Sequence, residues 1–216
     1  MPRRLVVSAH LDDAVLSAFS VMDGETTVVT VLAGLPPPGR VASWDAAGGA
    51  TDSFQRVEER RLEDEKALAV VGATPVHLAF ADGQYVSERM LAKPRKGDIV
   101  ARLEPLLRDV TDVYTPAGIG NREHALVREA VLAVRPDAVL YADLPYALVP
   151  ALGGFNLPRR VGREREPLDV WLEPAVIEAK LRAVRSYQTQ LPQLERDFGW
   201  FVNDHGLGHE RLWPPP

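Results

Sequence analysis

Short apolar runs rich in valine and leucine alternate along the chain with longer stretches of helical periodicity. The apolar runs occupy residues 5–9, 27–33, 76–80, 113–115 and 138–142. Because these runs are mostly continuous, they are typical of parallel strands covered on both faces. The helical stretches occupy residues 14–22, 55–71, 99–110, 123–134 and 174–187. The alternation predicts an α/β fold, a Rossmann-like three-layer sandwich with a mostly parallel sheet and right-handed crossovers.

The length of 216 residues predicts a single domain over residues 1–216. Two segments do not fit the alternation. Residues 34–53 are dense in proline, glycine and alanine, and an irregular stretch of this length predicts a functional loop, here an active-site lid. Residues 146–167 predict a surface excursion, and the final Trp-Pro-Pro-Pro predicts an exposed end. Gly72 is expected to stop the long second helix.

Composition excludes several classes of protein. The chain has no cysteine, so a metal would have to bind histidine and carboxylate side chains. The 25 Lys and Arg against 30 Asp and Glu give a net charge of −5, and nucleic acid is not expected as a partner. No stretch approaches the roughly 20 apolar residues of a membrane helix, and no signal peptide is recognisable. We therefore expect a cytoplasmic protein without a membrane partner.

A histidine and two aspartates follow the first predicted strand, at His10, Asp12 and Asp13. Ligands bind at the carboxyl ends of parallel strands, and this turn lacks the glycines of a dinucleotide site. A His and an Asp three residues apart can converge on one cation, a pairing that suits zinc. His10 and Asp13 then act as ligands, and Asp12 acts as the base. In the alternative, Asp12 or Asp13 only caps the following helix.

A catalytic zinc usually takes three protein ligands, so a further donor is required. His124 is the best placed, because it follows a strand and a glycine loop and returns to the same sheet edge. We expect its ring to lie within about 6 Å of the His10 ring. His77 is expected in the core or on a sheet face, and His205 and His209 in an exposed tail.

These residues resemble the zinc-dependent N-deacetylases of the PIG-L/LmbE type. Members of that family open with a strand and a [PA]-H-x-D-D turn, which residues 9–13 match. Their second motif, H-x-x-H at the start of a later helix, is matched in its last position by His124. The resemblance implies Zn²⁺ bound by His10, Asp13 and His124, with Asp12 as the general base.

Arg60 and Glu63 look like the R-x-x-E helix of that family, whose arginine faces the active site. A solvated helix face is the alternative for Arg60. The stretches 143–146 and 180–190 are also similar to later segments of such proteins. The likeness therefore spans most of the chain.

The chain departs from the family pattern at two positions. The acid that often follows the two aspartates is Ala14, and the first histidine of H-x-x-H is Asn121. The resemblance implies that this histidine stabilises the oxyanion of the tetrahedral intermediate. An amide donates a hydrogen bond but delivers no proton. Either Asn121 performs a weaker version of the task, or another group such as His209 takes it over.

Candidate substrate contacts lie outside these motifs. Trp44 and Asp45 in the predicted lid combine an aromatic face with an acceptor, which suits a sugar ring. A hydrophobic pin that holds the loop shut is the alternative, and Tyr146 and Trp171 are similar cases. The basic residues within 159–165 are interpreted as a solvated loop, and a site for an acidic substrate is the alternative.

The leading hypothesis is a metal-dependent amidohydrolase that removes an N-acyl group, most often acetyl, from an amino sugar or sugar-containing metabolite. The family resemblance implies this substrate class. A second hypothesis keeps the metal but changes the bond to another acyl or ester group in a natural-product pathway, because Asn121 departs from the motif. A third is a non-catalytic binding protein on the same fold. A homo-oligomer is compatible with all three.

Overall fold

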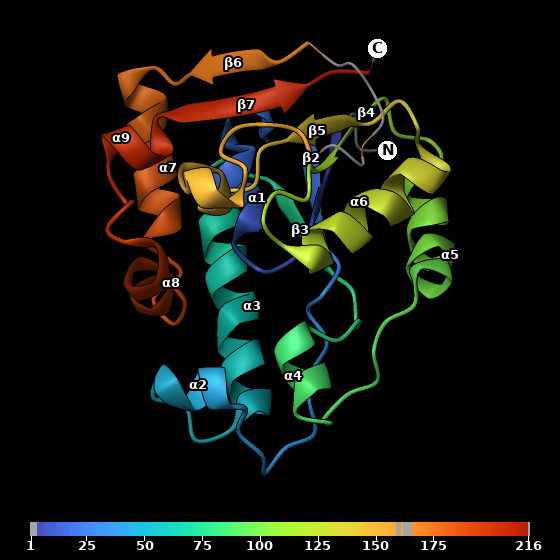
Figure 1. The fold of residues 1–216 in the computed structure, drawn as a ribbon, viewed down its shortest axis with the longest axis vertical. Coiled ribbons are helices and arrows are strands. Elements are labelled where there is room, and N and C mark those ends of the chain that lie inside the picture. The colour runs from blue at the N-terminus through green and yellow to red at the C-terminus, as the bar shows by residue number, and fades with distance from the viewer. Residues whose placement is uncertain (1–3, 159–160, 162–165, 216) are drawn as a thin grey trace.

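The computed structural model describes residues 4–158, 161 and 166–215, and its centre is a single mixed sheet of seven strands (Figure 1). The strand order is β3-β2-β1-β4-β5-β7-β6. The first five strands in this order are parallel, whereas β7 runs antiparallel to both of its neighbours. The strands are β1 Arg4–Ser8, β2 Thr26–Thr30, β3 Thr74–His77, β4 Asp112–Pro116, β5 Val139–Tyr141, β6 Leu168–Trp171 and β7 His209–Trp213.

Helices cover both faces of the sheet. Leu5 and Val7 of β1 pack in one apolar cluster with α5 and α6, whereas Val6 packs in a second cluster with α1, α3 and α7. Figure 1 shows these layers, with α5 and α6 on the right and α7 on the left. The helices are α1 Asp13–Ser17, α2 Ser43–Ala47, α3 Ser53–Ala69, α4 Gly83–Ser87, α5 Lys96–Leu107, α6 Arg122–Val134, α7 Pro174–Val184, α8 Leu191–Phe198 and α9 Asp204–Leu207.

The predicted Rossmann-like sandwich with a mostly parallel sheet is confirmed. The third strand begins and ends earlier than predicted, at Thr74–His77, because the chain then leaves the parallel ladder and forms an antiparallel bridge between Leu32 and Ala79. Gly72 adopts φ +75° just after α3, as its predicted stop requires.

The C-terminal part differs most from the prediction. Strands β6 and β7 were not predicted, and Trp213 is 3% exposed rather than part of an exposed end. Its burial follows from the position of β7 between β5 and β6. Residues 146–167 begin with two short 3-10 turns at Tyr146–Leu148 and Pro150–Leu152. The arginines of the predicted basic loop, Arg159, Arg160, Arg163 and Arg165, lie outside the described residues.

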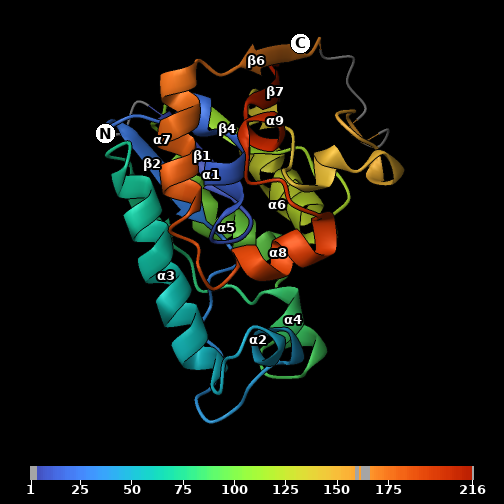
Figure 2. The same cartoon turned by 90° about the vertical axis from the view of Figure 1, so that its left-hand side faces the viewer.

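Residues 34–53 are not irregular throughout, because they contain α2. The Asp52 side chain caps α3 by accepting from the amides of Phe54 and Gln55 at 2.7 and 3.3 Å. The amide of Ser43 donates to Glu88 Oε1 at 2.6 Å, which ties α2 to the end of α4. Figure 2 shows α2 and α4 together at the lower end of the molecule, with α8 directly above them.

A buried ion pair joins segments that are distant in sequence. Lys180 Nζ of α7 lies 2.6 Å from Glu210 Oε1 of β7, and both side chains are fully buried. The Glu210 carboxylate also accepts from the backbone amides of Phe19 and Ser20 at 3.0 Å. One carboxylate therefore connects β7, α7 and the turn after α1.

The adjacent strands β1, β4 and β5 end at the same edge of the sheet. The loops after these strands carry the H-x-D-D turn, the segment from Asn121 to His124, and the segment from Asp143 to Tyr146. The topology therefore brings the predicted site residues to one place. No described helix has the length and apolar character required to cross a membrane.

Candidate metal centre and active site

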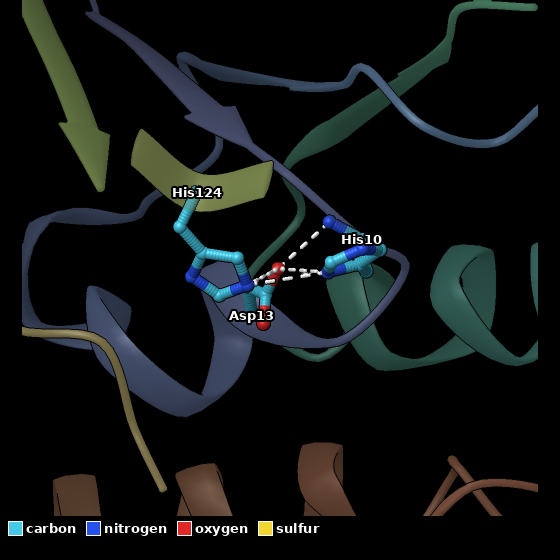
Figure 3. Close-up of side chains that lie close together, drawn as sticks. All are labelled: His10, Asp13 and His124. Atoms are coloured by element: carbon cyan, nitrogen blue, oxygen red, sulfur yellow. Dashed lines mark hydrogen bonds and ion pairs between the residues drawn. The ribbon is translucent and has the colours of Figure 1, made fainter. Parts of the chain in front are cut away.

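Three predicted ligands converge at the carboxyl edge of the sheet (Figure 3). His10 Nδ1 lies 3.1 Å from Asp13 Oδ2 and 3.2 Å from His124 Nε2, and the last two atoms are 3.2 Å apart. The rings of His10 and His124 have centroids 5.2 Å apart. Ligand atoms bound at about 2.0–2.1 Å to a tetrahedral zinc lie about 3.3 Å from one another. The spacing and the donor types therefore fit a divalent metal such as zinc.

The turn that carries His10 and Asp13 is closed by its own hydrogen bonds. The His10 amide donates to Asp13 Oδ2 at 2.7 Å, and the Ser8 hydroxyl donates to the His10 carbonyl at 2.7 Å. Asp12 occupies the N-cap position of α1, but its side chain makes no capping hydrogen bond. The interpretation of these aspartates as simple helix caps is therefore wrong.

His124 is held by a carboxylate that the sequence analysis did not assign to the site. Its Nδ1 lies 2.6 Å from Asp143 Oδ1, and the other oxygen of Asp143 accepts from the Ile119 amide at 2.8 Å. With the proton on Nδ1, the lone pair of Nε2 faces the other two ligand atoms. The signal for Asp143 was its position directly after a predicted strand at the same sheet edge.

Glu123 plays the same part for His10. Its Oε2 lies 3.3 Å from His10 Nε2, and its Oε1 accepts from the Gly83 amide at 2.8 Å. Burial acts to raise the pKa of Glu123, but the hydrogen bond to His10, the charges of His10 and His124 and the Gly83 amide together outweigh it, and the pKa lies below its usual value. In both histidines, the ring nitrogen that faces away from the three ligand atoms therefore has a carboxylate within hydrogen-bonding distance.

Asp12 lies beside the cluster without joining it. It is 7% exposed and lines the cavity. Burial is the main cause that raises its pKa to about 7, and the charge of Asp13 acts in the same direction. A carboxylate with a pKa near neutrality suits a general base. A divalent cation at the cluster would favour its ionised form.

The cluster opens into a cavity of about 340 Å³. The segments that follow the strands at the sheet edge supply its inner wall, and α2, α3, α4 and α8 with the residues that cap them supply its outer wall. The inner wall consists of His10, Asp12, Asp13, Asn121, Glu123, Pro145 and Tyr146. The outer wall consists of Trp44, Arg60, Asp82, Gln84, Gln190, Leu194, Asp197 and Phe198. Among the outer residues, only Trp44 and Arg60 were predicted from the sequence.

Trp44 and Arg60 lie against each other on the outer wall, with the guanidinium carbon 4.9 Å from the ring centroid. Arg60 is 4% exposed and pairs with Asp45 at 2.6 Å, so the alternative of a solvated arginine is wrong. Asp45 is fully buried and also accepts from Ser53 and Tyr85 at 2.5 and 2.9 Å. Because its oxygens are occupied in the protein, Asp45 is not a substrate contact, and this prediction is corrected.

Asn121 and Tyr146 meet on the inner wall. Asn121 Oδ1 accepts from the Glu123 amide at 2.8 Å as the cap of α6, and Asn121 Nδ2 donates to the Tyr146 hydroxyl at 2.9 Å. The Tyr146 ring stands edge-on to His124, with centroids 5.2 Å apart. Burial is the main cause that raises the pKa of Tyr146 to about 12.

The remaining histidines lie away from the cavity. His77 Nε2 lies 2.8 Å from Asp64 Oδ2, which agrees with the prediction of a sheet-face residue. His205 is exposed. His209 lies 2.7 Å from Asp169 and stacks on the exposed Trp171, so neither His209 nor Trp171 contributes to the site. The alternative in which His209 replaces the family histidine is therefore wrong.

The fold and this geometry define the class of the protein, an α/β protein with a three-ligand metal-type site at the carboxyl edge of its parallel strands. Comparison with known families makes the assignment specific. The PIG-L family model, described as GlcNAc-PI de-N-acetylase, matches residues 5–135. The chain belongs to the PIG-L family.

Solved structures agree with this assignment. The A40926 pseudoaglycone deacetylase Dbv21 is 29% identical with a TM-score of 0.80, and the alignment covers 99% of this chain and 96% of that one. The zinc-inhibited form of the teicoplanin deacetylase Orf2 is 26% identical with a TM-score of 0.76, over 98% and 97% of the two chains.

A more distant structure supports the fold alone. The 4-carboxy-2-hydroxymuconate hydratase GalB from Pseudomonas putida is 21% identical with a TM-score of 0.57, and the alignment covers 99% of this chain and 95% of that one. The search of curated protein sequences gave no match.

Proposed function

We propose that the chain is a zinc-dependent N-deacetylase that acts on an N-acylated amino sugar attached to a larger natural product. The observation that carries the proposal is the set of three ligand atoms, 3.1–3.2 Å apart, with Asp12 beside them in the lining of the cavity. Membership of the PIG-L family supports the reaction class. The deacetylases of A40926 pseudoaglycone and teicoplanin support the substrate class.

The residues divide the reaction between them. His10, Asp13 and His124 hold the metal, and zinc, when bound, supplies Lewis-acid activation of the carbonyl and of water. Asp12 accepts the proton of the attacking water and returns a proton to the nitrogen as the C–N bond breaks. The products are a carboxylate, acetate in the acetyl case, and a free amine. Asp143 and Glu123 keep the two imidazoles in the required tautomer.

The residues of the outer wall favour a substrate that extends beyond the sugar. Trp44, Leu194 and Phe198 present apolar and aromatic surface at the cavity, where an amino sugar on an aromatic scaffold would lie. We propose that residues 34–53 help to close the cavity over the substrate through α2, because α2 carries Trp44. A small free sugar would leave most of this surface without a partner.

Two measurements test the proposal together. Elemental analysis of the purified protein is expected to give one zinc per chain. Acetate release is then measured from a panel of N-acetyl amino sugars, presented free and attached to an aromatic glycopeptide scaffold. We expect release from the scaffold-bound sugars at the higher kcat/KM. A zinc-loaded protein that releases acetate from none of them would contradict the proposal.

A further inference from the structure

Hydrolysis of an amide passes through a tetrahedral carbon whose oxygen bears negative charge. A hydrogen-bond donor aimed at that oxygen lowers the barrier more than it strengthens substrate binding. The inference that follows rests on the proposed function and asks which side chain of the cavity supplies this donor. Besides the indole of Trp44, which lies against Arg60 on the outer wall, the described lining offers neutral or cationic donors at Arg60, Gln84, Gln190, Asn121 and Tyr146.

Three of these donors have other partners. Arg60 pairs with Asp45 on the outer wall and lies against Trp44. Gln84 Nε2 donates to Asp82 at 3.2 Å. Gln190 Nε2 donates to the Leu11 carbonyl at 3.2 Å. The two that remain, Asn121 and Tyr146, lie on the inner wall and contact each other.

The capping role of Asn121 decides how that pair is oriented. Its Oδ1 accepts the Glu123 amide at the start of α6, and a backbone amide can only donate, so the amide group cannot be reversed. The Nδ2 group therefore faces Tyr146, and the Tyr146 oxygen must accept. The proton of the phenol cannot point at Asn121. No residue in the described part of the chain accepts that proton.

The phenol also lies beside the metal ligands. Its ring packs edge-on against His124 at an interplanar angle of 76°, and also contacts Phe198, with centroids 5.0 Å apart. The charges of His10, Asp13 and Asp12 all act on the hydroxyl. A free phenol is protonated at neutral pH and can donate throughout the working range of the enzyme.

We propose that the Tyr146 hydroxyl donates the hydrogen bond that stabilises the oxyanion, and that Asn121 is the positioning residue that turns this proton toward the substrate. The pair supplies the donor that the first histidine of H-x-x-H would otherwise provide. Tyr146 reaches the site from the turn after β5, whereas Asn121 occupies the motif position itself.

The first test is Tyr146→Phe, which keeps the ring against His124 and Phe198 and removes only the hydroxyl. The expected result is a decrease in kcat of about 10²-fold, the usual cost of one oxyanion donor, with KM and zinc content nearly unchanged. Binding of a tetrahedral phosphonate analogue of the acetamide is expected to weaken by a similar factor in calorimetry. A Tyr114→Phe variant, on β4 and outside the cavity lining, controls for loss of a phenol and is expected to behave as wild type.

The second test addresses the positioning role. Asn121→Asp keeps an acceptor for the Glu123 amide but replaces the donor to Tyr146 by a second acceptor, so the phenol proton turns toward the new carboxylate. We expect kcat to fall nearly as far as in Tyr146→Phe. Because both changes remove the same hydrogen bond, the double variant is expected to be no slower than the worse single variant.

The outcomes separate this inference from the proposed function. Wild-type protein that releases no acetate would contradict both the proposed function and this inference. Active wild type with Tyr146→Phe at full kcat, or with a change in KM alone, would overturn only the inference and leave Tyr146 as a sugar contact. Fully additive losses in the double variant would overturn the positioning role of Asn121.

Discussion

The inner and outer walls of the cavity are built on different principles. On the inner wall, His10, Asp13 and His124 come from the segments that follow adjacent strands, and each of these three side chains has a hydrogen-bond partner. On the outer wall, α2, α4 and α8 lie outside the sheet, and Leu194 and Phe198 present apolar surface. We therefore expect the sheet edge to fix the chemistry and the added helices to determine which molecules reach it.

The largest effect is expected on the inner wall, at Asp12. Asp12→Asn keeps the three ligands but removes the base, and kcat should fall about 10²- to 10⁴-fold. Steady-state rates and zinc content, measured on the same sample, check this. Asp169→Asn, the same change outside the cavity, is the control. Near-normal turnover in Asp12→Asn would show that the inner wall does not depend on this carboxylate.

The next effect concerns the support of a ligand. Asp143→Asn removes the charge behind His124 and should lower zinc affinity or activity about 10- to 100-fold. Competition with a chelator measures the affinity. Asp64→Asn is a matched control, because Asp64 is also buried and also bonded to a histidine, but away from the site. Equal zinc affinity in the two variants would contradict the role of Asp143.

A substitution on the outer wall is expected to change KM rather than kcat. Leu194→Ala removes apolar surface at the cavity, so kcat/KM for a scaffold-bound sugar should fall about tenfold through KM, with little change for a small free sugar. Kinetics with both substrates check this, and Leu62→Ala, at an exposed leucine of α3, is the control. A similar fall in kcat/KM for both substrates would contradict a separate role for the outer wall in binding the scaffold.

The smallest effect concerns stability rather than chemistry. The hydrogen bond from the Gly39 amide is the main cause that lowers the pKa of Asp52; burial opposes it, and the amides of Phe54 and Gln55 lower the pKa further. A carboxyl with a lowered pKa in the folded state stabilises the fold above its ordinary pKa near 4, and this stabilisation is lost as the pH falls through the folded value. Asp52→Ala should lower Tm by about 2–4 °C at pH 7.

Thermal unfolding at several pH values tests the sign of that effect. The difference in Tm between Asp52→Ala and wild type should shrink as the pH falls below about 4, where the wild-type carboxylate is protonated. A constant difference down to pH 2 would show that the charge of Asp52 does not contribute. Activity per folded molecule should stay unchanged, since Asp52 does not line the cavity.

The sequence predicted the inner wall better than the outer wall, for a physical reason. His10, Asp13 and His124 follow apolar runs, and parallel strands bring such positions to one edge whatever the loops do. Asp143 follows the same rule and could have been found by it. The pairing of Asp45 with Arg60 depends on how α2 meets α3, which no local pattern specifies.

The helix α8 was missed because its contribution depends on contacts distant in sequence. The Gln193 side chain donates to the Trp44 carbonyl, a contact between residues of α8 and α2. Strands β6 and β7 were missed for a similar reason. Their antiparallel pairing joins segments separated by a long connection, and β6 is only four residues, Leu168–Trp171.

The Lys180–Glu210 pair has a consequence for synthesis. The ribosome makes the chain from its amino end, and the ammonium of Lys180 and the amides of Phe19 and Ser20 lack their shared carboxylate until Glu210 has left the exit tunnel. An unpaired buried charge is strongly destabilising. The nascent domain therefore completes the packing around Lys180 only after Glu210 has emerged, and until then the apolar surface that surrounds the pair stays incompletely packed.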